Sequence, residues 1–472
     1  QDGATLEFEG GHTWNGAVSA SGGTTRFQGG AFDMTGGGSF TNATGATLEM
    51  VSLASSPLTL RGPDGGARST ITNNGVTCTT DTGSANIVFD RSVEFINNGT
   101  FLVESDRGMD TADPDDDALF RNIGSFCKSG GVSTSFISVP FDNPGTVEVK
   151  TASLTISPSV VQQLQGNTLT GGAWIVNPDT VLSLDGGAAQ RILTNNGKII
   201  VRGNGVFVNL PDGSNTAAFT NNGTLCLEDN PNDPNAPGPT FITSGEFENN
   251  GTVKVSKKST LSTTLLDNDG QLRVDGTLTF GQESRWQSGR IAGNGTVNGT
   301  RITSGATTAP GASPGQLTIN ADFVNDPNGV IEIELGGLTP VAGHDVLVIG
   351  GPLTLSGQLH VLPALGFVPQ VGQQFEVITA QSISGQFSII RGPGRYDVDY
   401  GATSVTLTVL QSPCPGDLNG DNVSDLTDLA ILLANFGRSD GVTYADGDFD
   451  GDGIVGLVDL AVLLGDFGTL CN

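Results

Sequence analysis

The sequence is poor in the side chains on which most enzymes and nucleic-acid-binding proteins depend. Of its 472 residues only 15% are charged and 6% aromatic, and it has three histidines. Its 21 basic residues are outnumbered by 49 acidic ones, and the net charge of −28 would repel a phosphate backbone. No apolar run approaches the ~18 residues of a membrane span. We therefore expect neither a nucleic-acid partner nor a membrane span, whereas divalent cations would be attracted.

The sequence also lacks a recognisable catalytic constellation. His12, His344 and His360 are scattered and have no partners at ligand or triad spacing. The segment GASPG at 311–315 matches the pattern G-x-S-x-G, but Pro314 follows the serine and lacks the N–H that an oxyanion hole needs. The sequence therefore predicts no enzymatic activity.

Glycine is abundant, with 69 residues, and lacks the period of three that collagen requires. Many of these glycines belong to an Asn–Gly motif that recurs about every two dozen residues, the period of a solenoid rung. The copies are NNGV at 73–76, NNGT at 97–100, NIGS at 122–125, NPGT at 143–146, NNGK at 195–198, NNGT at 221–224, NNGT at 249–252, NDGQ at 268–271 and GNGT at 293–296, with a weaker copy, NPDTVLSL, at 177–184.

The residues that follow each motif glycine alternate as β-strands do. We expect one set to fill the solenoid interior, namely Phe101, Val103, Val147, Val149, Leu225, Leu227, Val253, Val255, Leu272 and Val274. Residues of the other set, such as Glu148, Lys254 and Arg273, should face outward. Asn–Gly should supply a left-handed turn, and stacked Asn side chains should hydrogen-bond from rung to rung.

The repeat weakens after residue 300. We expect a regular solenoid over 1–300 and a less regular continuation over 301–411. Residues 1–410 resemble the passenger regions of autotransporter-like secreted β-helices, and this resemblance implies a right-handed parallel β-helix rather than an activity. The sequence opens at Gln1 and not at Met, so we expect a processed protein that is secreted, at the cell surface or extracellular.

Residues 412–472 have a different composition, with abundant Asp and no Glu. The segments DLNGDNVSDLTD at 417–428 and DFDGDGIVGLVD at 448–459 place oxygen-bearing side chains at positions 1, 3, 5 and 12, as calcium loops require. The predicted ligands are Asp417, Asn419, Asp421, Asp428, the Val423 carbonyl and Asp425 in the first loop, and Asp448, Asp450, Asp452, Asp459 and the Ile454 carbonyl in the second. The sequence therefore predicts two calcium ions.

An amphipathic helix should follow each loop, and the two helices should bury their apolar faces against each other. These faces contain Leu429, Leu432, Leu433 and Phe436, and Leu460, Leu463, Leu464 and Phe467. Residues 414–472 resemble a type I dockerin, the duplicated calcium-binding segment of cellulosomal proteins, and similar modules end secreted proteins of planctomycete-like bacteria. Asp rather than Glu at position 12 of each loop is part of this likeness. The resemblance implies a paired EF-hand-like domain that docks to a cohesin-like protein.

Five cysteines are present. Cys414 and Cys471 bracket the calcium module, and a disulfide between them would contribute about 4 kcal/mol by loop entropy. Cys78, Cys127 and Cys226 each follow a motif glycine and should lie on the outward face. A rung between Cys78 and Cys127 would place them about 9.5 Å apart, too far for a disulfide unless the acidic insertion between them bends the stack. At least one cysteine must stay unpaired or pair between chains.

Two functional hypotheses follow. In the first, the protein is a non-enzymatic structural solenoid that self-associates end to end into an extracellular fibre or surface structure, with the calcium module as connector. In the second, it is a dockerin-anchored module that binds or cleaves polysaccharide, which would require a basic or aromatic cleft. Acidic insertions at 104–117 and 228–237 are expected to be solvated loops, with further calcium binding as the alternative. The low aromatic content favours the first hypothesis.

Overall fold

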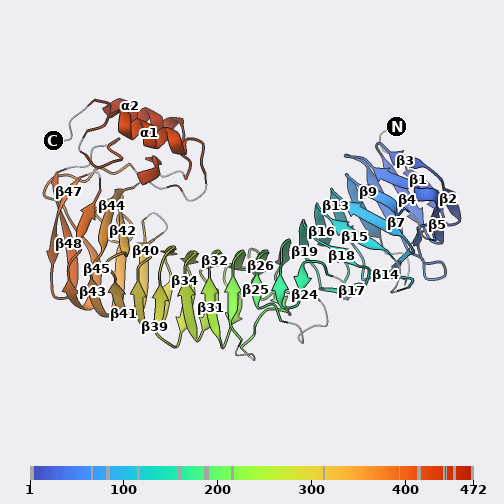
Figure 1. Cartoon of the computed structure of the whole chain (residues 1–472), viewed down its shortest axis with the longest axis horizontal. Helices are drawn as coiled ribbons and strands as arrows, with labels where there is room; N and C mark the ends of the chain where they lie inside the picture. The colour runs from blue at the N-terminus through green and yellow to red at the C-terminus, as the bar shows by residue number, and fades with distance from the viewer. Residues whose placement is uncertain are drawn as a thin grey trace. The chain divides into compact units, whose positions relative to one another are not determined.

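The computed structural model describes residues 5–64, 67–80, 85–113, 117–157, 161–184, 191–213, 217–311, 314–364, 366–392, 394–411, 416–421, 423–439, 442, 444–449 and 453–468. The chain divides into two compact units, Gln1–Ile242 and Thr243–Asn472. Each consists mainly of short parallel strands that lie side by side (Figure 1). The prediction of a mostly β protein with long parallel sheets is confirmed, and the arrangement is compatible with a β-solenoid.

In the first unit, successive strands join three parallel columns in turn, so that each strand pairs with the strand one rung earlier. Column A contains β1 (Thr5–Glu9), β4 (Thr24–Gln28), β7 (Thr47–Val51), β10 (Val76–Thr80), β13 (Thr100–Val103), β16 (Ser125–Lys128), β19 (Thr146–Val149), β23 (Ala173–Val176), β26 (Lys198–Arg202) and β29 (Thr224–Glu228). Column B contains β2 (His12–Trp14), β5 (Ala31–Met34), β8 (Thr59–Arg61), β11 (Ile87–Asp90), β14 (Met109–Thr111), β17 (Thr134–Ile137), β20 (Ser153–Ile156), β24 (Val181–Leu184) and β27 (Val206–Phe207).

The third column begins regularly and then changes. Column C contains β3 (Ala17–Ala20), β6 (Ser39–Asn42), β9 (Ser69–Asn73), β12 (Val93–Asn97), β15 (Leu119–Asn122) and β18 (Phe141–Asp142). A separate group follows with β21 (Leu164–Gln165), β22 (Thr168–Leu169), β25 (Thr194–Asn195) and β28 (Phe219–Asn221), of which β21 is antiparallel to β22. The unit also contains β30 (Thr240–Ile242) and the short 3-10 helix η1 (Thr35–Gly37).

The strand interiors agree with the predicted alternation. All ten residues expected inside are buried, and Glu148, Lys254 and Arg273 on the other face are partly exposed. Aromatic rings stack between rungs, with ring centroids 5.3 Å apart for Phe101 and Phe126. Burial of these side chains supplies the main driving force for stacking one rung on the next.

The predicted asparagine ladder is present and buried. The side-chain amide of Asn42 donates to Asn73 at 2.8 Å, and Asn73, Asn97 and Asn122 each donate to the next member at 2.7 Å, ending at Asn143. The amide oxygen of Asn42 and the amide nitrogen of Asn143 have no hydrogen-bond partner among the described residues. Each interior asparagine of the ladder therefore both donates and accepts a side-chain hydrogen bond, whereas one polar group at each end lacks a partner among the described residues.

The motif glycines do not adopt the predicted left-handed conformation. Gly99, Gly124 and Gly223 are not among the glycines with positive φ. Instead, a Cβ on Gly99 would lie 2.1 Å from the carbonyl oxygen of Gly75, and a Cβ on Gly124 would lie 2.1 Å from that of Gly99. Glycine is required at this corner because the rungs stack too closely for a side chain.

The weaker motif copy at 177–184 was assigned wrongly. The corner that aligns with the motif glycines is at Gly172, since Ala173 N donates to Gly145 O at 2.9 Å and Lys198 N donates to Gly172 O at 2.9 Å. Gly172 has no Asn–Gly motif around it, so the motif could not identify this rung in the sequence.

The second unit has two groups of parallel strands. One contains β32 (Thr252–Val255), β35 (Gln271–Val274), β38 (Arg290–Gly293), β40 (Thr307–Pro310), β42 (Val330–Leu335), β44 (Gln358–Pro363) and β46 (Ile389–Arg391). The other contains β31 (Glu246–Asn249), β33 (Thr260–Thr263), β34 (Leu265–Asn268), β36 (Thr277–Phe280), β37 (Ser284–Trp286), β39 (Thr296–Ser304), β41 (Gln316–Asn325), β43 (Val346–Leu355) and β45 (Gln374–Gly385). From β39 onward, one long strand replaces two short ones, because β39 pairs with both β36 and β37.

The parallel stack of the second unit ends in an antiparallel pair. Strand β48 (Ser404–Gln411) runs antiparallel to β45, and β47 (Arg395–Tyr400) runs antiparallel to β48. The chain's own hairpin thus covers the outer edge of β45 over residues 374–379.

Two helices, α1 (Leu426–Asn435) and α2 (Leu457–Asp466), follow the strands, with the short 3-10 helix η3 (Tyr444–Asp446) between them. Their shared core consists of Leu432, Phe449, Val455 and Leu463. The expectation that both helices bury their whole apolar faces is wrong, since Leu433, Leu464, Phe436 and Phe467 are all exposed. Within the described residues, no helix has the length and apolar character needed to cross a membrane.

Candidate metal centre

The first predicted calcium loop is closed by the aspartate at its twelfth position. Asp428 lies in the first turn of α1 and is fully buried. Its Oδ1 accepts hydrogen bonds from the backbone N–H groups of Leu418 at 2.8 Å and Asn419 at 3.0 Å, and its Oδ2 accepts one from Asp425 N–H at 2.8 Å. Asp425 caps the same helix by accepting a hydrogen bond from Thr427 N–H at 2.7 Å.

The second loop repeats this closure. Asp459, in the first turn of α2, is 1% exposed. Its Oδ1 accepts from Phe449 N–H at 2.7 Å and its Oδ2 accepts from Gly456 N–H at 2.6 Å. Gly456 stands where the first loop has Asp425, so α2 has no capping side chain at its N-terminus. Over the residues described in both loops, the closing aspartates make equivalent hydrogen bonds, whereas the helix caps differ.

The other predicted ligands of the first loop bond to its backbone. Oδ1 of Asp417 accepts from Gly420 N–H at 2.8 Å and from Asp421 N–H at 3.1 Å. Oδ1 of Asn419 accepts from Asp421 N–H at 2.8 Å, and Oδ1 of Asp421 accepts from Val423 N–H at 2.9 Å. These bonds fold the loop tightly.

The second loop is described only in part. Asp448 is buried, and its Oδ2 accepts from Gly453 N–H at 3.1 Å. Gly453 has a φ of 86°, a left-handed conformation that glycine adopts without steric cost. Ile454 is exposed. Asp450 and Asp452 lie outside the described residues.

The predicted ligands suit calcium by their chemistry. Every one of them offers oxygen, the ligand that a hard divalent cation prefers. Over the part of the chain that the structure describes, however, no three His, Cys, Asp or Glu side chains converge on one point where an ion would fit. The backbone bonds of Asp417 and Asp421 use Oδ1, and a carboxylate has a second oxygen that can bind an ion. Calcium binding therefore stays a prediction.

Each half of this module also bonds to the other half. Gly437, just after α1, donates its N–H to Val455 O of the second loop at 2.8 Å. Gly468, just after α2, donates its N–H to Ser424 O of the first loop at 2.8 Å. Both glycines have positive φ, so that the chain can turn back from each helix. These reciprocal bonds link the end of each helix to the opposite loop.

The outer surface of the module is apolar at equivalent positions of the two halves. Leu426 and Leu457, the first residues of the two helices, are 72% and 75% exposed, and Val458 is 58% exposed. Leu433 and Leu464 are also exposed at equivalent positions farther along the helices. Repeated exposed leucines of this kind are unusual on a surface that faces only water.

The cysteine predictions have mixed outcomes. Cys414 and Cys471 lie outside the described residues. Cys78 and Cys127 are free thiols, and the strand register places Leu102 between them, which confirms the predicted intervening rung. Cys127 aligns with outward-facing Glu148, in agreement with the predicted outward face, yet both thiols are covered and neither exceeds 8% exposure. Burial raises the pKa of each thiol to about 11, so neither should react readily at neutral pH.

The histidines have structural contacts. The ring of His344 is buried, with Nδ1 3.2 Å from Gly337 O and Nε2 3.3 Å from Glu376 O. His360 Nε2 lies 3.2 Å from Gln358 Oε1. The ring of His12 stacks on that of Phe32, with an angle of 28° between the ring planes and centroids 6.1 Å apart. None of the three contacts an acid or a nucleophile in these interactions.

Sequence reasoning missed a buried acid beside His344. Asp345 is 1% exposed, and its carboxylate accepts from Gly315 N–H at 2.7 Å and Glu334 N–H at 2.9 Å. Burial, together with the charge of Glu334, raises the pKa of Asp345 to about 8. In the sequence this residue opens an apolar run that reads as an ordinary strand, so no local signal identifies it.

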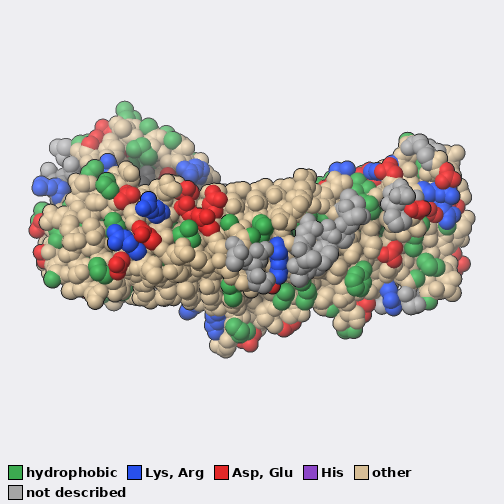
Figure 2. Space-filling view, turned by 60° about the horizontal axis from the view of Figure 1, so that its bottom comes forward, with side chains coloured by type: hydrophobic (Ala, Val, Ile, Leu, Met, Phe, Trp, Pro, Cys, Tyr) green, Lys and Arg blue, Asp and Glu red, His purple; other side chains and the backbone are tan. Residues whose placement is uncertain are grey.

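The charged side chains on the face seen in Figure 2 lie in small groups in which Lys and Arg neighbour Asp and Glu. Among the described residues, Arg202 pairs with Glu228 at 2.9 Å and Arg121 with Asp142 at 2.9 Å.

Comparison with models of known protein families finds no match, and comparison with curated proteins finds none either.

Proposed function

We propose that this protein is a secreted, non-enzymatic structural β-solenoid that assembles end to end, with a calcium-loaded C-terminal module as the connector. The observation that carries the proposal is the repeated apolar surface of the module, formed by Leu426, Leu457 and Val458. Apolar side chains exposed at matching positions of both halves are suited to burial against another protein surface.

Calcium would give this surface its fixed geometry. Asp417, Asn419, Asp421, Asp425, Asp428 and the Val423 carbonyl would hold one ion, and Asp448, Asp450, Asp452, Asp459 and the Ile454 carbonyl the other. A bound ion would neutralise the mutual repulsion of the clustered carboxylates. Asp428 and Asp459 already join each loop to the first turn of its helix, so ordering of a loop would be passed to Leu426 or Leu457 directly.

The proposal is tested by calorimetric titration of the full chain with calcium, combined with light scattering. We expect two ions per chain and calcium-dependent growth of particles. The double variant Asp417→Ala/Asp448→Ala should lose both, and Leu426→Ser/Leu457→Ser should bind calcium but stay monomeric. Asp397→Ala, a change at an exposed acid of β47, serves as the matched control and should behave as wild type.

Two results would contradict the proposal. The absence of calcium uptake by the wild-type chain would contradict a calcium-loaded connector. A chain that stays monomeric in millimolar calcium at high protein concentration would contradict end-to-end assembly. Release of reducing or unsaturated sugars from a panel of acidic polysaccharides would instead support a dockerin-anchored polysaccharide-cleaving protein.

A further inference from the structure

The corner that leads into column A carries two adjacent asparagines in four rungs of the first unit. The first asparagine of each pair is fully buried, and the second lies outside it and is followed by a motif glycine. We call the second set the outer asparagines, namely Asn74, Asn98, Asn196 and Asn222. Asn74 is partly exposed and the other three are exposed, so solvent reaches all four.

An asparagine that precedes glycine can lose its side-chain amide without an enzyme. The glycine nitrogen gives its proton to solvent, attacks the side-chain Cγ and displaces ammonia, which closes a five-membered succinimide ring. Water then opens the ring at either carbonyl and leaves Asp or isoaspartate. Glycine favours the attack because no Cβ obstructs it. In a folded protein the reaction also requires that the local hydrogen bonds of both groups open.

The glycine N–H groups of the four rungs are bonded in two different ways. Gly99 N–H donates to Asn73 O at 2.9 Å, so a backbone carbonyl of the preceding rung holds the attacking nitrogen. Gly75 N–H donates instead to Asn73 Oδ1 at 3.2 Å, on a side chain of its own rung. The later pair of rungs repeats both arrangements, with bonds from Gly223 N–H to Asn195 O at 2.9 Å and from Gly197 N–H to Asn195 Oδ1 at 3.0 Å.

The length of the preceding corner explains this difference. The corner of an Asn–Gly rung is short, since residues 74–75 alone connect β9 to β10. The rung before Gly75 has a longer corner, residues 43–46 between β6 and β7, and the rung before Gly197 has residues 170–172 between β22 and β23. The backbone carbonyls of a longer corner are spaced differently, and the glycine N–H bonds to the nearer side-chain oxygen instead.

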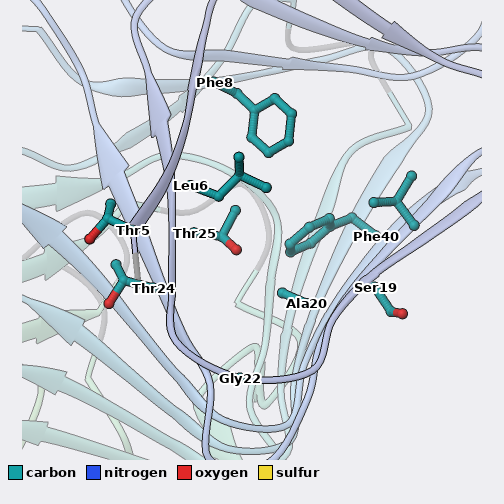
Figure 3. A pocket seen from close by; sticks show the side chains of 10 residues that line it. Thr5, Leu6, Phe8, Ser19, Ala20, Gly22, Thr24, Thr25 and Phe40 are labelled. Carbon is teal, nitrogen blue, oxygen red and sulfur yellow. The ribbon is translucent and has the colours of Figure 1, made fainter. Parts of the chain in front are cut away.

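The first of these longer corners follows a well-anchored strand. Phe40 of β6 is 1% exposed and packs against Phe27, with ring centroids 5.0 Å apart. Figure 3 shows the Phe40 ring in the interior, across a pocket from Leu6 and Phe8. The strand cannot shift without disturbing this packing, so the different bonding of Gly75 is a fixed feature of the stack.

The side-chain amides of the outer asparagines are also held unequally. Asn98 Nδ2 donates to Asn74 Oδ1 at 2.9 Å, and Asn222 Nδ2 donates to Asn196 Oδ1 at 2.9 Å. The amide nitrogens of Asn98 and Asn222, which would leave as ammonia, are therefore bonded. Those of Asn74 and Asn196 donate to no other described residue. A carboxylate at Asn98 would face the Asn74 oxygen, whereas one at Asn74 would still accept the bond from Asn98.

An aspartate already occupies the outer position in a rung of the second unit. Asp269 stands between Asn268 and Gly270 in the copy NDGQ, and Gly270 N–H donates to Asn249 O at 2.8 Å. The product of deamidation is thus compatible with the corner where its neighbours leave room for a second oxygen.

We propose that Asn74 and Asn196 are sites of spontaneous deamidation in the folded protein, and that the stack protects Asn98 and Asn222. Each event consumes one water, releases one ammonia and turns one side-chain amide into a carboxylate, or into an isoaspartate linkage that lengthens the main chain. The inference goes beyond the proposed function and requires neither calcium nor another chain.

Peptide mapping by mass spectrometry tests the inference on the full chain. The folded protein is kept in mildly alkaline buffer, and the loss of each side-chain amide is followed over time. Loss at Asn74 and Asn196 should be about fivefold faster than at Asn98 and Asn222, the factor expected for one additional backbone hydrogen bond. In guanidinium chloride all four should react at similar rates, because each precedes glycine and the stack is absent.

Two variants test the protection by side-chain bonds. Asn74→Asp and Asn98→Asp each introduce the product of deamidation and add the same charge, one rung apart. Asn74→Asp should keep the wild-type midpoint of urea unfolding, whereas Asn98→Asp should lower it because its carboxylate faces the Asn74 oxygen.

The outcomes decide the inference in either direction. Equal rates at the four positions of the folded protein, or faster loss at Asn98 or Asn222, would overturn it. A folded protein that keeps all four amides while the denatured chain loses them would overturn it as well. Equal unfolding midpoints for the two aspartate variants would refute the protection assigned to the Asn98 side chain.

Discussion

At the scale of single residues, the close approach of consecutive rungs explains why glycine recurs at the motif corner. A Cβ on Gly270 would lie 2.1 Å from the carbonyl oxygen of Gly251, and one on Gly223 would lie 2.1 Å from that of Gly197. Contacts this short with backbone atoms cannot be relieved by rotating a side chain. The motif glycines therefore fix the distance between rungs at the corner, independently of any special φ.

We predict that Gly99→Ala lowers the free energy of unfolding by about 3 kcal/mol, because its methyl group would overlap the Gly75 carbonyl and force two rungs apart. Gly171→Ala is the matched control, since a Cβ there meets nothing within 4 Å, and its effect should stay within about 0.5 kcal/mol. Urea unfolding followed by circular dichroism measures both. Equal unfolding midpoints for the two variants would contradict the argument.

At the scale of secondary-structure elements, the two C-terminal helices differ in how they begin. Both have an aspartate in the first turn that accepts backbone N–H groups of its own loop. Only α1 also has a capping side chain, Asp425, whereas α2 has Gly456 at that position. A cap satisfies a backbone donor that would otherwise depend on water.

We predict that Asp425→Ala increases hydrogen exchange of α1 about fivefold in EDTA, which corresponds to the loss of about 1 kcal/mol typical of a cap. Gly456→Ala changes the equivalent residue without removing a cap, and exchange of α2 should change less than twofold. Mass spectrometry of peptides covering 426–435 and 457–466 reports the two helices separately. A similar increase in both helices would show that Asp425 contributes nothing specific.

The strands were more predictable from sequence than the helices. Alternation after each motif glycine identified residues such as Phe101 and Val149 as interior, because side chains in a strand have only two directions to point. Helical spacing likewise identified an apolar face on each helix, but it does not predict how much of that face is buried against other residues. In this small module only Leu432 and Leu463 of the eight expected residues are fully buried.

For the candidate metal site, the sequence names the residues, and their binding of calcium stays a prediction. Loop spacing selects which oxygens can converge, and Asp428 and Asp459 do bond back to their own loops. Where each carboxylate points depends on competing backbone N–H donors, as for Asp417, and sequence spacing contains no information on that competition. The burial of the thiols was not predictable for a related reason. Cys127 aligns with outward-facing Glu148, yet its short side chain is covered by its surroundings.

At the scale of the whole molecule, the buried carboxyl of Asp345 adds a pH-dependent contribution to stability. The native carboxyl of Asp345, with its pKa raised to about 8, retains a proton that the unfolded chain releases near pH 4. The native state thus binds more protons in this interval, and the free energy of unfolding should fall as pH rises from about 4 to about 8. Below pH 4 the carboxyl is protonated in both states and does not change the free energy of unfolding. Above pH 8 it is ionised in both states, and the fall in the free energy of unfolding is complete.

We predict that Asp345→Asn removes this contribution, so that stability declines less between pH 5 and pH 8 than in the wild type. Glu376→Gln, at an exposed acid on β45, should keep the wild-type profile. Urea midpoints measured at several pH values test the difference in slope, even if Asp345→Asn is less stable throughout. Parallel profiles for wild type and Asp345→Asn would refute the assignment.

The buried asparagine ladder gives the first unit a built-in direction. Every amide from Asn42 to Asn122 donates towards the C-terminal side, so the small dipoles of successive side chains point the same way and add, as peptide dipoles do in a helix. Hydrogen bonds in such a row also polarise one another. The row ends in an uncompensated oxygen at Asn42 and an uncompensated N–H₂ group at Asn143. A single member with its amide reversed would set donor against donor and oxygen against oxygen, so the amides of the ladder must all point the same way.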